Sequence, residues 1–293
     1  MSVPITLVPI GRPAREPQRE IALTIDGRAA RVPEGSTILS ACAAIGLTIP
    51  TLCFLETLKP VNVCRLCVVE VEGPRVLVPS CSRAVEAGMV VHTRSPRVML
   101  ARKLVLELLA SSVDLSTAPG MAELLREYGC DPGRFGAPAA TVAQPVKIDN
   151  DLYLRDYAKC VLCYKCVEAC GPDHQNTFAI AVAGRGFGAH ISTEFTVALP
   201  DSACVYCGNC IAVCPTGALM TVREYELRKS GNWDPSRQST TDTICPYCGV
   251  GCTLTLHVQD GEIVNATSPL DNKITAGNLC IKGRFGWRFV EGP

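Results

Sequence analysis

The chain has 293 residues, 47% of them hydrophobic and 19% charged, which is enough for about two to three small domains. Its 28 basic and 28 acidic residues balance, so no net charge draws it to nucleic acid or to a membrane surface. Cysteine is the unusual residue, with 18 copies, many of them only two or three residues apart. Such close cysteines strain a disulfide, and no export signal is present, so the composition favours metal ligation in a reducing compartment.

The first 18 residues are expected to form a tail. Their apolar start is followed by Arg and Pro, which is not the order of a secretory signal, and this predicts a cytoplasmic protein. The longest apolar run, residues 98–113, is interrupted by Arg102, Lys103 and Glu107. It therefore predicts an amphipathic packing helix with a solvated face and not a membrane span.

Residues 19–97 predict a β-grasp domain. Alternation over residues 19–27 and 29–35 predicts a hairpin, Ser36 can cap a short helix, and residues 67–73 and 74–81 predict two more strands. The cysteines of this part follow C-x10-C-x2-C-x13-C, which keeps the central C-x2-C of plant-type [2Fe–2S] ferredoxins but has a longer first loop. We assign one [2Fe–2S] cluster to Cys53, Cys64, Cys67 and Cys81.

Residues 149–229 contain two copies of C-x2-C-x2-C-x3-C, and Pro215 follows the second copy. This is the bacterial ferredoxin run, in which the fourth cysteine ligates the other cluster. Two zinc ions could also use eight thiolates, but the run is much more specific to iron–sulfur clusters. One [4Fe–4S] cluster is assigned to Cys160, Cys163, Cys166 and Cys214, and a second to Cys170, Cys204, Cys207 and Cys210.

Residues 243–293, after a linker over residues 230–242, predict a small β-rich domain. Residues 252–268 alternate as a hairpin with an Asp-Gly turn at Asp260–Gly261. The cysteines follow C-x2-C-x3-C-x27-C, and for Cys245 and Cys248 a structural zinc stays open as an alternative. We assign a third [4Fe–4S] cluster to Cys245, Cys248, Cys252 and Cys280.

The remaining cysteines and the histidines are expected to have ordinary roles. Cys42 lies on the apolar face of the short helix, where a free cysteine packs as a small hydrophobe, and Cys130 lies at a loop. Residues 183–188, AGRGFG, predict a turn because they lack the spacing of a dinucleotide fingerprint. The histidines are expected on the surface or in loops, with a cluster contact left open for the second of them: His92, His174, His190 and His257.

These motifs resemble a known group of proteins. The segment LCFLETLKPVNVCRLCVVEVEG…VLVPSCSRAVEAGMVVHT resembles the [2Fe–2S] domain shared by the complex I large iron–sulfur subunit, iron-only hydrogenases and NAD-linked formate dehydrogenase α subunits. The dicluster region resembles the segment that follows it in those proteins. Residues 243–290 resemble the first domain of molybdopterin oxidoreductases, formate dehydrogenases especially. The α+β chain after about residue 19 thus resembles the front of a cytoplasmic NAD-dependent formate dehydrogenase α subunit.

The chain departs from that resemblance in two places. Residues 98–148 predict a helical connector, and its stretch 108–135 has no histidine and only Cys130, so the His/Cys3 cluster common in the group is expected to be absent. In the group a pterin-binding body follows the CxKGR segment, so the last domain is expected to be incomplete and no catalytic ligand is assigned. The Mo/W-bis-pterin is expected in a partner or in a missing C-terminal region. The resemblance implies that Lys282 assists electron passage to the pterin; the alternative is a surface lysine.

The implied function is an iron–sulfur relay of a formate dehydrogenase, between a Mo/W-pterin site and an NADH-binding flavoprotein (FMN) partner, without nucleic acid or membrane insertion. Whether the chain is itself an enzyme stays undecided. One alternative is a relay subunit of an NAD-coupled hydrogenase or electron-bifurcating complex, although relay subunits of hydrogenases generally lack the CPYCGVGC module. Another is a truncated or relict protein that binds clusters and transfers nothing useful.

Overall fold

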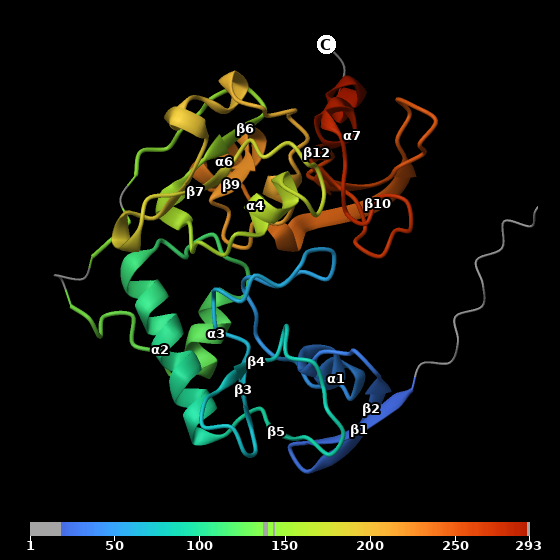
Figure 1. Cartoon of the computed structure of the whole chain (residues 1–293). Coiled ribbons are helices and arrows are strands. Elements are labelled where there is room, and N and C mark those ends of the chain that lie inside the picture. The colour runs from blue at the N-terminus through green and yellow to red at the C-terminus, as the bar shows by residue number, and fades with distance from the viewer. Residues whose placement is uncertain (1–18, 137–139, 143, 292–293) are drawn as a thin grey trace, which may run out of the picture.

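A computed structural model describes residues 19–136, 140–142 and 144–291 of this α+β chain (Figure 1). The predicted tail of residues 1–18 lies outside the described residues. Figure 1 shows the N-terminal sheet at one end, helices α2 and α3 along one side, and the dicluster region and the C-terminal hairpin together at the other end. Within the described residues, no helix is long and apolar enough to cross a membrane.

The N-terminal domain is built on a five-stranded sheet in the order β2-β1-β5-β3-β4. The predicted hairpin is present as an antiparallel pair, and β5 adds parallel to β1. A short helix, α1, packs its buried Ile38, Ala41 and Cys42 on this sheet. The bounds are β1 Glu20–Ile25, β2 Arg28–Pro33, α1 Ile38–Ala44, β3 Val68–Val71, β4 Val78–Pro79 and β5 Val90–His92.

Helix α1 begins one residue later than predicted. Thr37, and not Ser36, is its N-cap, and the Thr37 hydroxyl accepts a hydrogen bond from the Ser40 amide at 3.2 Å. Both residue types cap helices well, so composition alone could not choose between them.

Helix α2 (Pro96–Ser112) and helix α3 (Met121–Glu127) form the predicted connector. The expected solvated face of α2 is wrong for two of its charged residues, because Arg102 is 1% exposed and Glu107 is fully buried. Arg102 donates to the Tyr128 hydroxyl at 2.9 Å and to the Val68 carbonyl at 2.8 Å. The helix lies between the N-terminal sheet and the loop after α3, so Arg102 and Glu107 meet polar groups and not water.

The dicluster region pairs β6 antiparallel with β9 and places α4 beside α5. Residues 183–188 span the last residue of β7 and most of its connection to β8, in accord with the predicted turn. Helix α6 follows β9 directly. The bounds are β6 Tyr153–Arg155, α4 Lys165–Cys170, β7 Ala181–Ala183, β8 His190–Ser192, α5 Asn209–Ala212, β9 Leu219–Thr221 and α6 Val222–Lys229, with 3-10 turns at Tyr157–Lys159, Gly186–Gly188, Glu194–Thr196, Leu199–Asp201 and Pro235–Arg237.

The C-terminal domain is a three-stranded sheet in the order β10-β11-β12, followed by helix α7 (Ile281–Phe285) and a 3-10 turn over Gly286–Glu291. The predicted hairpin joins β11 (Thr253–Gln259) to β12 (Glu262–Thr267) through Asp260 and Gly261. Both turn residues have positive φ, 55° and 86°, as a type I′ turn requires. Strand β10 (Gln238–Ile244) begins inside the residues that we predicted as a linker.

The parts of the chain contact one another directly. The Lys59 amide, in the loop after Cys53, donates to the Asp173 carboxylate at 2.7 Å, and His174 Nε2 lies 3.0 Å from the Thr57 carbonyl oxygen. Leu58 packs in the same place against Ala169 and Val213 of the dicluster region. The loop between α2 and α3 joins that region as well, through the Thr117 hydroxyl, which donates to the Thr216 carbonyl at 2.6 Å.

Candidate iron–sulfur sites

The first cysteine set lies beside strand β3 in two pairs. The pKa of Cys64 is lowered to about 5 because the Cys53 thiol donates a hydrogen bond to its sulfur. The pKa of Cys67 is lowered to about 6 by the same kind of bond from Cys81. Residues Asn62 and Arg65, with φ of 64° and 57°, turn the loop that carries Cys64 and Cys67. Of the four cysteines only Cys64 is half-buried; Cys53, Cys67 and Cys81 are buried.

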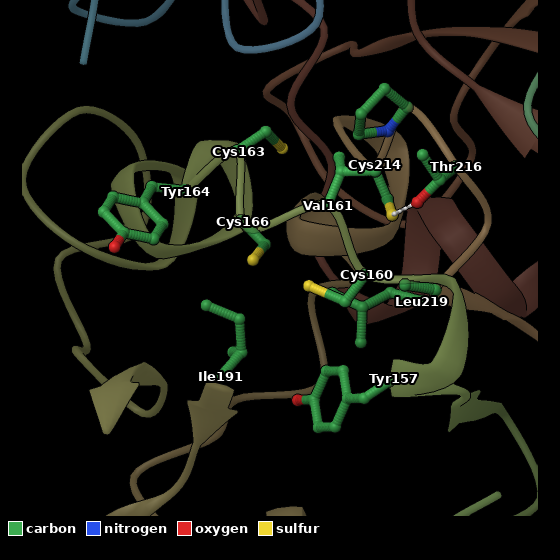
Figure 2. A pocket seen from close by; sticks show the side chains of 12 residues that line it. Tyr157, Cys160, Val161, Cys163, Tyr164, Cys166, Ile191, Cys214, Thr216 and Leu219 are labelled. Carbon is green, nitrogen blue, oxygen red and sulfur yellow. Dashed lines mark hydrogen bonds between the residues drawn. The ribbon is translucent and has the colours of Figure 1, made fainter. Parts of the chain in front are cut away.

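The second set surrounds one cavity. Cys160, Cys163 and Cys166 of the first ferredoxin run face the same space as Cys214 of the second run (Figure 2). An apolar wall that includes Ile191 completes the lining of this space. The structure therefore brings together the four residues that the crossover rule groups.

The third set lines a second cavity, with about 380 Å³ of empty space. Two hydroxyl groups lie close to its sulfur atoms: the Tyr153 oxygen is 3.2 Å from Cys204 Sγ, and Thr177 Oγ1 is 3.4 Å from Cys170 Sγ. The Tyr206 amide donates to Cys204 Sγ at 3.4 Å. The cysteines that line this cavity are Cys170, Cys204, Cys207 and Cys210.

Backbone turns shape the cavity of the second set. Leu162 and Tyr164 have φ of 50° and 65°, and the amide groups of Leu162 and Lys165 donate to the sulfur atoms of Cys160 and Cys163. Burial raises the pKa of these thiols, to about 11 for Cys160 and about 12 for Cys163. The hydrogen bonds from the two backbone amides offset this rise only in part. Amides aimed at buried sulfur favour the thiolate form, which is the form that ligates metal.

The fourth set lies on the edge of the C-terminal sheet and is the most open. Cys245 is buried, Cys252 is half-buried, and Cys248 and Cys280 are exposed. The Cys245 amide donates to the Cys252 carbonyl at 2.8 Å, which closes the loop between them. Burial raises the pKa of Cys252, and the nearby thiols of the other three cysteines raise it further, so the four lie close together. Lys282 is exposed, and its Nζ lies 5.7 Å from the ring centroid of Tyr247.

The residues around these sites fit iron–sulfur clusters. The Tyr157 hydroxyl is buried, lines the second set's cavity and has no hydrogen-bond partner among the residues that the structure describes; a cluster or thiolate sulfur there would accept its hydrogen bond (Figure 2). In the described part of the chain, no three or more His, Cys, Asp or Glu residues are arranged to hold a single metal ion. Zinc would need its four sulfur ligands only about 3.8 Å apart, given Zn–S bonds of about 2.3 Å, whereas a cluster keeps its ligands farther apart.

Sequence reasoning missed two residues between the third and fourth sets. Arg284 is 2% exposed and donates to the Asn209 side-chain oxygen and the Ala266 carbonyl, both at 3.2 Å, and to the Cys207 carbonyl at 3.4 Å. The same Asn209 oxygen accepts from the Leu279 amide at 3.1 Å. Burial lowers the pKa of Arg284 to about 10, and the nearby Cys207 and Cys210 partly offset this. The only signal was position: Asn209 stands between two cysteines, and Arg284 follows the CIKG segment.

The other singled-out residues make ordinary packing and hydrogen-bond contacts, and Cys42 shares its core with Cys67 and Cys81. Cys42 is fully buried in the N-terminal core, and Cys130 Sγ is 3.9 Å from the Lys103 carbonyl oxygen. His174, for which a cluster contact was left open, contacts the Thr57 carbonyl. The remaining histidines pair with Glu72, Gly188 and Thr267: His92, His190 and His257 respectively.

Comparison with known families agrees with this arrangement. Residues 18–96 match the 2Fe-2S iron-sulfur cluster binding domain, residues 159–218 the 4Fe-4S dicluster domain, and residues 238–292 the molybdopterin oxidoreductase Fe4S4 domain. The first two matches are a [2Fe–2S] domain followed by a dicluster domain, which is the order predicted from the sequence. The third places the cysteines of the open site in a domain type named for molybdopterin oxidoreductases.

Two curated relatives are similar to more than two thirds of this chain. The NADPH-Fe(3+) oxidoreductase subunit alpha of Geobacter sulfurreducens is 35% identical over 93% of this chain. The NADP-reducing hydrogenase subunit HndD of Solidesulfovibrio fructosivorans is 40% identical over 68% of this chain. The chain spans only about a third of these relatives, 32% and 36% of their lengths.

A solved structure supports the fold alone. The NAD+-reducing [NiFe]-hydrogenase in its H2-reduced state superposes with a TM-score of 0.59 at 24% identity, over 69% of this chain and 87% of that one. Relatives that match more than nine-tenths of this chain also include the mitochondrial NADH-ubiquinone oxidoreductase 78 kDa protein of Candida albicans and a formate dehydrogenase of Staphylococcus haemolyticus, which are 30% and 25% identical. The chain thus matches the N-terminal iron–sulfur region of the family that contains the complex I 75 kDa subunit, NAD-linked formate dehydrogenase and hydrogenase.

Proposed function

We propose that this chain is the iron–sulfur relay of an NAD-linked formate dehydrogenase and that it passes electrons between a Mo/W-pterin site and a flavin/NAD partner. One observation carries the proposal: a molybdopterin oxidoreductase Fe4S4 domain follows the dicluster domain and contacts it through Arg284, Asn209 and Leu279. A relay needs its sites to be neighbours, and this contact joins the last two cysteine sets.

The proposal assigns four clusters to the four cysteine sets and keeps the domain bounds predicted above. Bound clusters would supply one-electron carriers, whose potentials depend on net charge, hydrogen bonds to sulfur and solvent exposure. The chain's own residues supply the rest. The apolar walls around Ile191 and Leu199 exclude water, and the hydroxyl groups of Tyr153, Tyr157 and Thr177 lie where they can donate to sulfur.

The proposed partners follow from the two ends of the relay. The N-terminal [2Fe–2S] domain would face an NADH-binding flavoprotein, and the open site around Cys248 and Cys280 would face the pterin-containing subunit or domain. The exposure of Lys282 near Tyr247 supports the proposed role of this lysine in electron passage to the pterin.

A hydrogenase relay is the second candidate, favoured by the relative HndD. The HndD match covers 68% of this chain, whereas the Geobacter oxidoreductase and formate dehydrogenase matches cover 93% and 94%. The molybdopterin oxidoreductase domain over residues 238–292 therefore favours the first candidate.

Iron and acid-labile sulfide assays of the anaerobically purified chain test the cluster assignment. We expect about fourteen iron atoms, two from one cluster and four from each of three others. Cys163→Ser should remove one [4Fe–4S] signal from the reduced EPR spectrum and leave the [2Fe–2S] signal. A content near two iron atoms with bound zinc, or loss of the [2Fe–2S] signal in this variant, contradicts the assignment.

The isolated native complex tests which substrates exchange electrons with the relay. Formate and NADH should each reduce the clusters of the isolated complex under anaerobic conditions, as followed by visible absorbance. Reduction by hydrogen in place of formate would establish the hydrogenase alternative. Reduction by neither, although dithionite reduces the clusters, would favour a relict protein.

A further inference from the structure

We propose that Arg284 is a positioning residue that fixes the Cys280 segment on the Cys207–Cys210 loop and places a buried positive charge beside the cluster of that loop. The inference deepens the proposed relay and rests on the assignment of a [4Fe–4S] cluster to Cys170, Cys204, Cys207 and Cys210. It names the residues that couple the molybdopterin-type domain to the dicluster domain and predicts which cluster they tune.

The first step is the contact itself. Asn209 is 3% exposed, and its side-chain oxygen accepts from both the Leu279 amide and Arg284 Nη2. Leu279 immediately precedes Cys280, so a single amide oxygen holds the backbone at one cysteine set while standing between two cysteines of the other. An alanine or a leucine in place of Asn209 would have no side-chain acceptor for either donor.

The second step is the closeness of the two backbones. Gly208 has φ of +69°, and a Cβ on it would lie 3.0 Å from Arg284 Cγ and 3.0 Å from Phe285 Cζ. Only glycine at this position lets the loop approach helix α7 without displacing it. The arginine and the glycine are therefore complementary parts of one contact.

The third step is the charge. Within the described residues, the three hydrogen bonds that the Arg284 guanidinium donates go to neutral oxygens, the carbonyls of Cys207 and Ala266 and the side-chain amide oxygen of Asn209. The guanidinium is thus buried without a carboxylate among these partners, and its field is not cancelled at the contact. A cluster becomes more negative on reduction, so a nearby buried cation stabilises the reduced form and raises the reduction potential.

Potentiometric EPR titration of the whole chain, with redox mediators and dithionite, tests the charge. Arg284→Gln should lower the potential of one [4Fe–4S] signal by about 59 mV, a tenfold change in the one-electron reduction equilibrium. Arg284→Lys keeps the charge. Its potential should therefore lie closer to that of the wild type than to that of Arg284→Gln. Arg288→Gln is the matched control, since Arg288 is exposed and bonds only the Asp151 carbonyl, and it should change no potential.

A second variant identifies the cluster. Tyr153→Phe removes the hydroxyl beside Cys204 Sγ, so it should lower the potential of the same signal that Arg284→Gln moves. Unchanged potentials in Arg284→Gln, or a shift in a signal other than that of Tyr153→Phe, overturn the proposal.

The positioning part has its own measurement. Asn209→Ala should accelerate hydrogen exchange of the Leu279 amide at least tenfold while the charge of Arg284 is kept; unchanged exchange overturns it. If Arg284→Gln does not retain its clusters, Arg284→Lys and Asn209→Ala decide the proposal through the same two readouts. None of these measurements uses formate or NAD, so failure of the formate assignment and failure of this inference are separate results.

Discussion

At the scale of single residues, the buried charges depend on partners that lie far along the chain. Arg102 is held by Tyr128 and by the Val68 carbonyl, 26 and 34 residues away. Glu107 accepts from the Asp131 amide at 3.0 Å and from Arg134 at 2.8 Å. The Asp131 amide and the Arg134 guanidinium lower the pKa of Glu107, so the buried carboxylate stays ionised near neutrality.

Replacement of Arg102 should show how much this burial contributes. Arg102→Ala leaves the Val68 carbonyl and the Tyr128 hydroxyl unpaired and opens a cavity, so it should lower the free energy of unfolding by about 3 kcal/mol. Arg102→Met fills the volume and should cost about 1–2 kcal/mol, from the hydrogen bonds alone. Urea unfolding followed by [2Fe–2S] absorbance gives both values. Arg97→Ala, at an exposed arginine, is the control, and equal losses for Ala and Met would refute the cavity argument.

The cysteine ligands could be grouped from sequence, whereas their supporting residues could not. Spacing alone predicts that Cys214 joins Cys160, because a short loop presents only three thiolates to one cluster. Arg284 reaches Asn209 across 75 residues, and Tyr153 reaches Cys204 across 51. Such contacts depend on how segments far apart in the sequence pack together, within a domain or between domains, and no local period or spacing records them.

At the scale of elements, turns with positive φ decide where strands and ligand loops change direction. The hairpin of β11 and β12 was predictable because Asp-Gly is the sequence of a type I′ turn. Strand β10 was not, because its polar stretch of Gln, Ser, Thr and Asp resembles a linker and its residues are almost all exposed. It is a strand because its backbone pairs with β11 over its whole length.

The hairpin turn gives a direct test at this scale. Gly261→Ala places a side chain at φ of +86°, so it should destabilise the C-terminal domain by about 1 kcal/mol. Gly188→Ala is the control: its φ is not positive and no atom lies within 4 Å of an added Cβ, so it should stay within about 0.5 kcal/mol of the parent. Thermal unfolding of the two variants gives the comparison. Equal stabilities would mean that the turn tolerates a side chain.

At the scale of the whole molecule, the contacts between domains join the segments beside the first and fourth cysteine sets to the dicluster region. The loop after Cys53 meets the dicluster region through Lys59, Thr57 and Leu58, and α7 meets it through Arg284. Sequence indicated the order of the domains but not their faces of contact. Those faces are made of single loop residues whose types are common on any surface.

Loss of Asp173 should loosen the first of these contacts. Asp173→Ala removes the charged acceptor of the Lys59 amide, a bond worth about 1.5–3 kcal/mol. Hydrogen exchange of that amide should therefore become at least tenfold faster, while amides of the β1–β2 hairpin keep their rates. Asp271→Ala, at an exposed aspartate of the C-terminal domain, should change neither. Unaltered exchange at Lys59 in Asp173→Ala would show that the loop is held by its apolar contacts.

The exposure of Cys248 and Cys280 has a practical consequence for anyone who handles the protein. Molecular oxygen and chelators reach thiolates at the surface before those inside closed cavities, so damage in air should begin at the fourth set. After exposure to air, a preparation should contain about ten iron atoms per chain, which is about fourteen minus the four of one lost [4Fe–4S] cluster. The missing four would report the openness of that site, while the buried sets would still be intact.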